Sequence, residues 1–165
     1  MTITARTDSE KAAEQTRISL EYQLNTQRRR QQHHGVVVTP IEVTDFIIRS
    51  LVHQLKTERG RDPDQGIEWL DPFAGTGIFT ARLLQIVELS PERKRDLAEN
   101  CIAVEIDPDA AQTCFDNLAR VHHEETGHRG FIRVICADTF ALDPDYDLWS
   151  DNYGHPGVIH LPTKH

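Results

Sequence analysis

The sequence is poor in cysteine, methionine and aromatic residues, and it contains no long hydrophobic run. Its 165 residues include three cysteines, one methionine and 7% aromatic residues. An odd cysteine count without a Cys-x-x-Cys pair excludes a disulfide scaffold, so we expect Cys101, Cys114 and Cys136 to be reduced, buried thiols. No apolar run approaches the ~18 residues that span a membrane, and residues 1–11 lack the apolar core of a signal peptide. We therefore expect a one-domain, cytoplasmic protein without a membrane partner.

The charge is acidic and unevenly distributed. The chain carries −8 in total, but residues 1–34 hold six Lys and Arg against four Asp and Glu, a net charge of +2. The remainder therefore carries −10, which argues against a free-standing nucleic-acid binder, because such a protein needs a basic surface. Residues 9–32 read as one polar helix that ends in the basic run 28–30. We interpret residues 1–34 as a solvated helical arm, and the alternative is a basic element that touches phosphates.

Short apolar runs alternate with helical patterns from residue 35 onward. Helices are expected near residues 40–56, 78–87 and 91–99 and after Asp107, and strands at 67–70, 101–106, 131–136 and 146–150. This alternation predicts an α/β fold with a doubly wound parallel sheet of about four strands. We expect the domain to cover residues 35–150 and an irregular tail to follow at 151–165. Thr39 is the predicted N-cap of the first of these helices, with Pro40 at its first position and Glu42 closing a capping box.

The segment with the strongest functional indication is Asp-Pro-Phe-Ala-Gly-Thr-Gly at residues 71–77, between a strand and a helix. Glycines at the end of a first strand let the backbone turn sharply and let a ligand approach closely. A dinucleotide fingerprint would need a third small residue where Thr80 stands, so a nicotinamide-dependent oxidoreductase is disfavoured.

Acidic residues follow the next two predicted strands. Glu105 ends its strand, where a carboxylate can accept hydrogen bonds from both hydroxyls of a ribose; the alternative is a surface glutamate. Asp107 fits a helix cap better than a ligand contact. Asp138 is either an acceptor for an adenine amino group, with Phe140 packed on the ring, or a turn residue at the strand end.

These motifs resemble the N-6 adenine-specific DNA methyltransferases of restriction–modification systems. Residues 71–77 resemble that family's S-adenosylmethionine motif, and residues 105–108 and 137–140 resemble its second and third motifs. Residues 35–40, Gly-Val-Val-Val-Thr-Pro, resemble the element that closes over the methionine end of the cofactor. The resemblance implies a Rossmann-like class I methyltransferase fold with S-adenosyl-L-methionine as cofactor. It implies cofactor contacts from Thr39, Pro40, Asp71, Phe73, Gly75, Gly77, Glu105, Ile106, Asp138, Thr139 and Phe140, with Asp71 at the methionine end and Glu105 at the ribose.

The sequence departs from this family at its catalytic motif, Asn/Asp-Pro-Pro-Tyr/Phe, which is absent. Asn152 and Tyr153 keep two of its residue types without the prolines, either as a remnant of the catalytic motif or by chance. We therefore expect the cofactor-binding part of a methyltransferase that is inactive alone, either a truncated product or a piece completed by a second polypeptide. DNA is the expected partner of the complete enzyme.

The sequence leaves two alternative functions and a metal site to weigh against this one. A non-catalytic cofactor-binding or interaction module is the main alternative, and an RNA amino-methyltransferase fragment is disfavoured by the Thr-Pro element. A metal site is also disfavoured, because His122, His123 and His128 lie in a polar segment without a cysteine pair or an HExxH helix.

Overall fold

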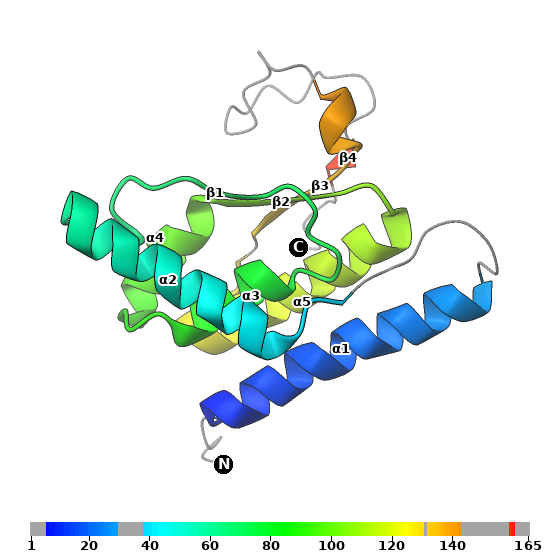
Figure 1. The fold of residues 1–165 in the computed structure, drawn as a ribbon, viewed down its shortest axis with the longest axis horizontal. Coiled ribbons are helices and arrows are strands. Elements are labelled where there is room, and N and C mark those ends of the chain that lie inside the picture. The colour runs from blue at the N-terminus through cyan, green and yellow to red at the C-terminus, as the bar shows by residue number, and fades with distance from the viewer. Residues whose placement is uncertain (1–5, 30–37, 131, 143–158, 161–165) are drawn as a thin grey trace.

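The computed structural model describes residues 6–29, 38–130, 132–142 and 159–160. A long N-terminal helix, α1 (Asp8–Arg29), precedes an alternation of helices and strands (Figure 1). The helices are α2 (Ile41–Arg59), α3 (Ile78–Ile86), α4 (Pro91–Glu99) and α5 (Pro108–Thr126), with a 3-10 turn η1 at Thr139–Ala141. The strands are β1 (Trp69–Asp71), β2 (Cys101–Glu105), β3 (Arg133–Cys136) and β4 (Ile159–His160).

The sheet contains three parallel strands in the order β1-β2-β3, and β4 pairs antiparallel with β3. Asp71 pairs with Ala103, and Glu105 pairs with Cys136, so the carboxyl ends of the strands lie at one edge. The predicted parallel α/β sheet is thus confirmed for these strands. The strand expected at 146–150 lies outside the described residues. The tail expected to be irregular at 151–165 does include a short strand, because Ile159 and His160 extend the sheet beyond β3.

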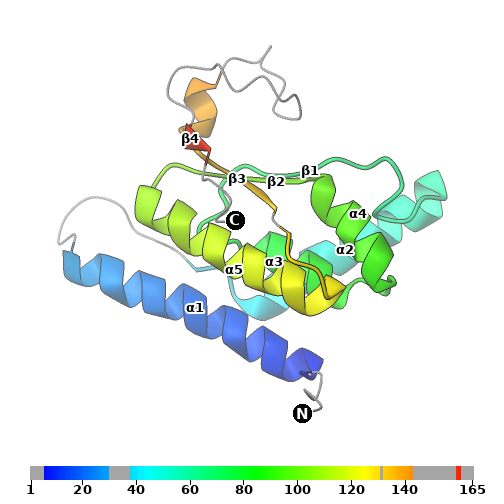
Figure 2. The same ribbon diagram turned by 180° about the vertical axis from the view of Figure 1, so that it is seen from behind.

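Helices α1 to α5 lie on one face of the sheet (Figures 1 and 2). The crossovers from β1 to β2 and from β2 to β3 run in the same direction, and right-handed crossovers then place their helices on the same face. This half is compatible with a Rossmann-like fold. The second helical layer that a doubly wound sheet requires is not found among the described residues.

Strands β2 and β3 are mostly buried on both faces, as expected for parallel strands, whereas Leu70 of β1 is 44% exposed. Cys101 and Ala103 face the helices and belong to the main core, together with residues of α3, α4 and α5. Ile102, Val104, Ile135 and Ala137 form a second, smaller cluster on the opposite face, against which Leu142 packs. The three cysteines are buried and free, and burial raises the pKa of the Cys101 thiol to about 12, so it stays protonated.

Two of the three predicted helix N-caps are confirmed. Ser90 caps α4 by accepting from Arg93 N, and Asp107 caps α5 by accepting from the backbone N–H groups that follow Pro108. The capping box at Thr39 is wrong. The N-cap of α2 is Pro40, whose carbonyl accepts from Val43 and Thr44 N, and no side chain caps the helix. The helix therefore begins one residue too late for Thr39 to reach its first turn.

Helix α1 is packed against the domain, so its interpretation as a solvated arm is wrong. The buried Gln15 exchanges two hydrogen bonds with Asn117 of α5, at 3.0 and 2.8 Å. The buried Ser19 lies 2.9 Å from Thr76, hydroxyl to hydroxyl. The sequence shows no continuous apolar face because this helix is docked by paired polar side chains. Of the basic run, Arg30 and the side chains of 28–29 lie outside the described residues.

A buried arginine joins three helices. Arg82 of α3 is completely buried and donates from Nε and Nη2 to the two carboxylate oxygens of Asp45 on α2, both at 2.7 Å. Asp8 of α1 lies 3.0 Å from the same guanidinium. Because an unpaired buried charge is costly, this arrangement fixes α1 and α2 relative to α3.

Among the described residues, no helix combines the length and the apolar character that a membrane span requires.

Candidate ligand-binding site

The loop after β1 and the turn after β2 meet at the carboxyl edge of the sheet. Glu105 joins them, because its Oε2 accepts from Gly75 N at 2.8 Å and its Oε1 accepts from Asp107 N at 2.9 Å. Each carboxylate oxygen retains a lone pair for a further donor. Glu105 is thus a part-buried side chain that holds both loops, and its role toward a ribose stays a prediction.

The two glycines of the loop have different roles. Both have positive φ, 55° at Gly75 and 81° at Gly77, a region that favours glycine. A Cβ on Gly77 would lie 2.8 Å from Cys114 Sγ and 3.1 Å from a Leu118 carbon, so this glycine allows α3 to pack on α5. A Cβ on Gly75 would meet nothing within 4 Å. Gly75 is thus the position at which the loop presents bare backbone to open space.

Asp71 ends β1 with a carboxylate that is only partly satisfied. Its Oδ1 accepts from Phe73 N at 3.4 Å, whereas its Oδ2 is buried and has no hydrogen-bond partner among the described residues. Burial raises the pKa of Asp71 to about 6, and the nearby Glu105 charge adds to the increase. A buried acceptor without a partner is costly, so a cationic or hydrogen-bond-donating ligand would be stabilised here.

The loop after β3 forms another side of the site. Thr139 Oγ1 donates to Pro72 O at 2.6 Å, and the rings of Phe73 and Phe140 lie 5.4 Å apart, tilted by 37°. Both rings are exposed, 62% for Phe73 and 86% for Phe140, so a flat apolar group would find aromatic surface here. Asp138 is exposed and caps η1 by accepting from Phe140 N at 3.0 Å. Its predicted turn role is confirmed, and its role toward adenine stays a prediction.

The remaining predicted site residues lie in different surroundings. Thr39 lines a cavity of about 80 Å³ together with Phe73, Gly75 and Thr76, whereas Pro40 is exposed and begins α2. Ile106 is 63% exposed beside Glu105. Asn152 and Tyr153 lie outside the described residues, so their catalytic role is untested.

Sequence reasoning missed the contribution of α1 to this cavity. Ser19 and Tyr22 line it opposite the glycine loop. The spacing of Gln15, Ser19 and Tyr22 at intervals of four and three residues does place them on one helical face. This face does not form an apolar stripe in the sequence, because Gln15 and Ser19 are polar.

The histidines of α5 have a structural role where the structure describes them. His122 is buried, and its Nδ1 lies 3.2 Å from His128 O. The part of the chain that the structure describes contains no cluster of three or more His, Cys, Asp or Glu side chains placed to hold a metal ion.

The difference between the two loop glycines predicts different stabilities. We expect Gly77→Ala to lower the free energy of unfolding by about 2–4 kcal/mol, because left-handed strain adds to overpacking against α5. Gly75→Ala should cost only the strain, about 1–2 kcal/mol. Gly127→Ala is the matched control, since Gly127 has φ of 74° and open space around it. If urea denaturation gives Gly77→Ala and Gly127→Ala the same loss in the free energy of unfolding, the packing role of Gly77 is contradicted.

The raised pKa of Asp71 predicts a pH-dependent stability. The unfolded carboxyl loses its proton near 3.8 and the folded one near 6, so the ligand-free fold loses stability as the pH rises from about 4 to 6. Asp71→Asn should therefore be more stable than the wild type at pH 7, by about 1–3 kcal/mol, and the difference should shrink toward pH 4. The exposed Asp96→Asn serves as control in urea denaturation across this range. A gain for Asp71→Asn that does not change with pH would refute the argument.

Comparisons with known proteins found similarity to parts of three longer chains. No family model and no curated protein matches the sequence. The structure is similar to part of the cryo-EM DrdV–DNA complex, with a TM-score of 0.68 and 20% identity over 76% of this chain; this likeness shows the fold alone.

Two further neighbours are more similar in sequence. A nuclease-deletion mutant of the Type ISP restriction-modification enzyme LlaGI, in complex with a DNA substrate mimic, matches with a TM-score of 0.57 and 30% identity over 64% of this chain. The ATP-dependent Type ISP restriction-modification enzyme LlaBIII, bound to DNA, matches with a TM-score of 0.53 and 32% identity over 58%. The matches cover 13%, 10% and 7% of the DrdV, LlaGI and LlaBIII chains, respectively. The described fold therefore resembles a small part of restriction-modification enzymes.

Proposed function

We propose that this chain is the S-adenosylmethionine-binding part of an adenine-specific DNA methyltransferase of a restriction–modification system. The observation that carries the proposal is the site at the carboxyl ends of β1 and β2. There Asp71, whose buried Oδ2 has no hydrogen-bond partner among the described residues, ends β1 four residues before the open backbone of Gly75, which Glu105 holds in place. The family motifs at these positions and the restriction-modification neighbours support the same function.

The residues present fit the chemical groups of this cofactor. Asp71 would hold the ammonium of the methionine end, since a cation restores the ionised carboxylate that burial disfavours. Glu105 would accept from the ribose hydroxyls with its remaining lone pairs, and Gly75 would let the ligand approach the backbone. Phe140 and Asp138 would meet the adenine ring and its amino group. When bound, the cofactor supplies an activated methyl group.

The acceptor in this proposal is the exocyclic amine of an adenine flipped out of DNA. Asn152 and Tyr153 are the candidates for orienting that amine, and a second polypeptide is the proposed source of the remaining methyltransferase and target-recognition parts. The net charge of −8 implies that this chain alone binds DNA weakly, because it offers few cations to replace phosphate counterions.

A non-catalytic cofactor-binding module is the second candidate function. It is favoured by the absence of an Asn/Asp-Pro-Pro-aromatic sequence anywhere after Asp138. An RNA amino-methyltransferase is less well supported, because the Thr39–Pro40 element and the restriction-modification neighbours both favour DNA.

Calorimetric titration with S-adenosylmethionine tests the cofactor site. We expect binding, and we expect Glu105→Ala to weaken it by roughly 1.5–3 kcal/mol, the scale of hydrogen bonds to a charged acceptor. Glu99→Ala is the control, since Glu99 is an exposed acid at the end of α4. Equal affinities for the wild type and Glu105→Ala would remove Glu105 from the site, and no binding by the wild type would refute the cofactor assignment.

Transfer of labelled methyl groups to mixed genomic DNA at low salt tests whether this chain is active alone. We expect no incorporation by the purified chain alone, because the residues that normally orient the target amine are incomplete. A complete adenine methyltransferase provides the positive control. Incorporation that Asn152→Ala abolishes would overturn this expectation and identify residues 152–153 as a working, shortened catalytic loop.

A further inference from the structure

Helix α1 reaches the candidate site from the side opposite the sheet. Its residues Ser19 and Tyr22 line the cavity of about 80 Å³ that the glycine loop forms with Thr39. Tyr22 also lines a second, more polar cavity of about 260 Å³, bounded by Thr26 and by Asp107 after β2. Tyr22 therefore stands between the loop that carries Gly75 and the turn that follows Glu105.

The position of α1 is fixed by buried hydrogen bonds to the same loop. Ser19 pairs with the Thr76 hydroxyl, and Asn117 Nδ2 donates to Thr76 O at 2.9 Å while it also bonds Gln15. A buried polar network of this kind is stable only when its members stay paired. Any displacement of α1 would therefore break bonds to the residue between the two loop glycines.

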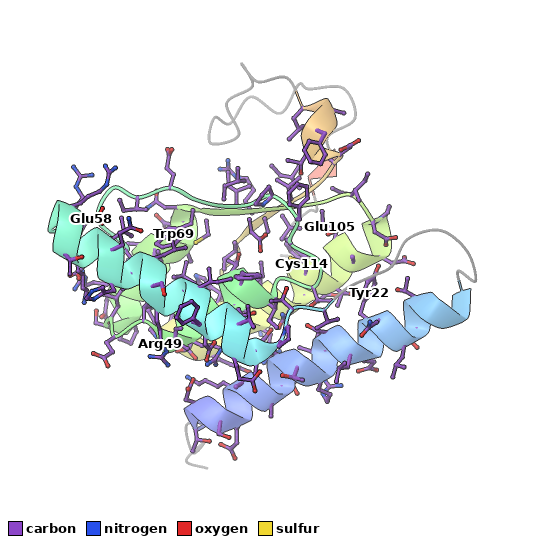
Figure 3. All side chains as sticks on the ribbon, in the orientation of Figure 1. Tyr22, Arg49, Glu58, Trp69, Glu105 and Cys114 are labelled. Atoms are coloured by element: carbon purple, nitrogen blue, oxygen red, sulfur yellow. The ribbon has the colours of Figure 1, made fainter. Side chains whose placement is uncertain are left out.

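The Tyr22 side chain is half-buried and lies on the side of α1 that faces α5 and the Glu105 end of β2 (Figure 3). Burial raises the pKa of its hydroxyl, the hydrogen bond with Thr26 lowers it, and Asp107 raises it through its charge and through a hydrogen bond, with a smaller effect of the Glu105 charge. At neutral pH the hydroxyl therefore keeps its proton and donates it to the Asp107 carboxylate. Its acidic surroundings match a ligand whose hydroxyls these carboxylates accept.

We propose that α1 is a wall of the S-adenosylmethionine pocket and that Tyr22 contacts the bound cofactor with its ring, while its hydroxyl stays bonded to Asp107 beside the ligand. This inference rests on the proposed function of the site. It assigns α1 a role in cofactor binding instead of a role in binding nucleic acid phosphates.

The inference is tested on the full chain by titration with S-adenosylmethionine. Tyr22→Phe removes the hydroxyl but keeps the ring, so we expect its binding to stay within about threefold of the wild type. Tyr22→Ala also removes the ring and should weaken binding at least tenfold. Leu24→Ala is the matched control, because Leu24 is 56% exposed on the same helix and lines neither cavity; it should stay within twofold.

Urea denaturation of each variant distinguishes ligand contact from a structural role. Both Tyr22 variants lose the hydroxyl's hydrogen bonds to Thr26 and Asp107 and should unfold at a lower urea concentration than the wild type, but only Tyr22→Ala should lose affinity for S-adenosylmethionine. If the wild type binds and both Tyr22 variants bind equally well, the inference is overturned and the proposed function stands. If the wild type does not bind, the proposed function itself fails, and the inference fails with it.

Discussion

The carboxylate of Glu105 is the interaction on which the candidate site depends. It accepts one backbone N–H from the glycine loop and one from the turn before α5, so a single side chain sets the distance between the two loops. Parallel pairing of β1 and β2 makes this possible, because it brings both carboxyl ends to one edge of the sheet. A charged acceptor strengthens both bonds.

The glycine loop is constrained from behind as well. Gly77 leaves room for Cys114 and Leu118, so α3 packs closely on α5 and begins directly after the loop. Asn117 and Ser19 hold Thr76 from α5 and α1. The loop is thus tied to its surroundings on both sides of Gly75, while Gly75 itself faces open space. Such preorganisation lowers the cost of binding, because the loop does not have to be ordered by the ligand.

The glycine loop is well ordered without a ligand, whereas the environment of Asp71 is unfavourable without one. Burial raises its pKa to about 6 and leaves one oxygen without a partner among the described residues. A fold that keeps such a group loses stability at neutral pH. This cost is understandable when a bound cation compensates for it, and strained or unsatisfied groups are common at functional sites for this reason.

The sequence by itself determined the order of the helices and strands from α1 to β3, the caps at Ser90 and Asp107, and the placement of Asp71 and Glu105 at strand ends. These features are local, since hydrophobic periodicity, turn residues and motif spacing act over a few neighbouring residues. Tertiary structure decided that Gly77 makes room for α5, that Glu105 bridges two loops and that α1 is docked. The docking of α1 could not be read from the sequence, because Gln15 and Ser19 become a buried face only when Asn117 and Thr76, 102 and 57 residues away, supply their hydrogen-bond partners.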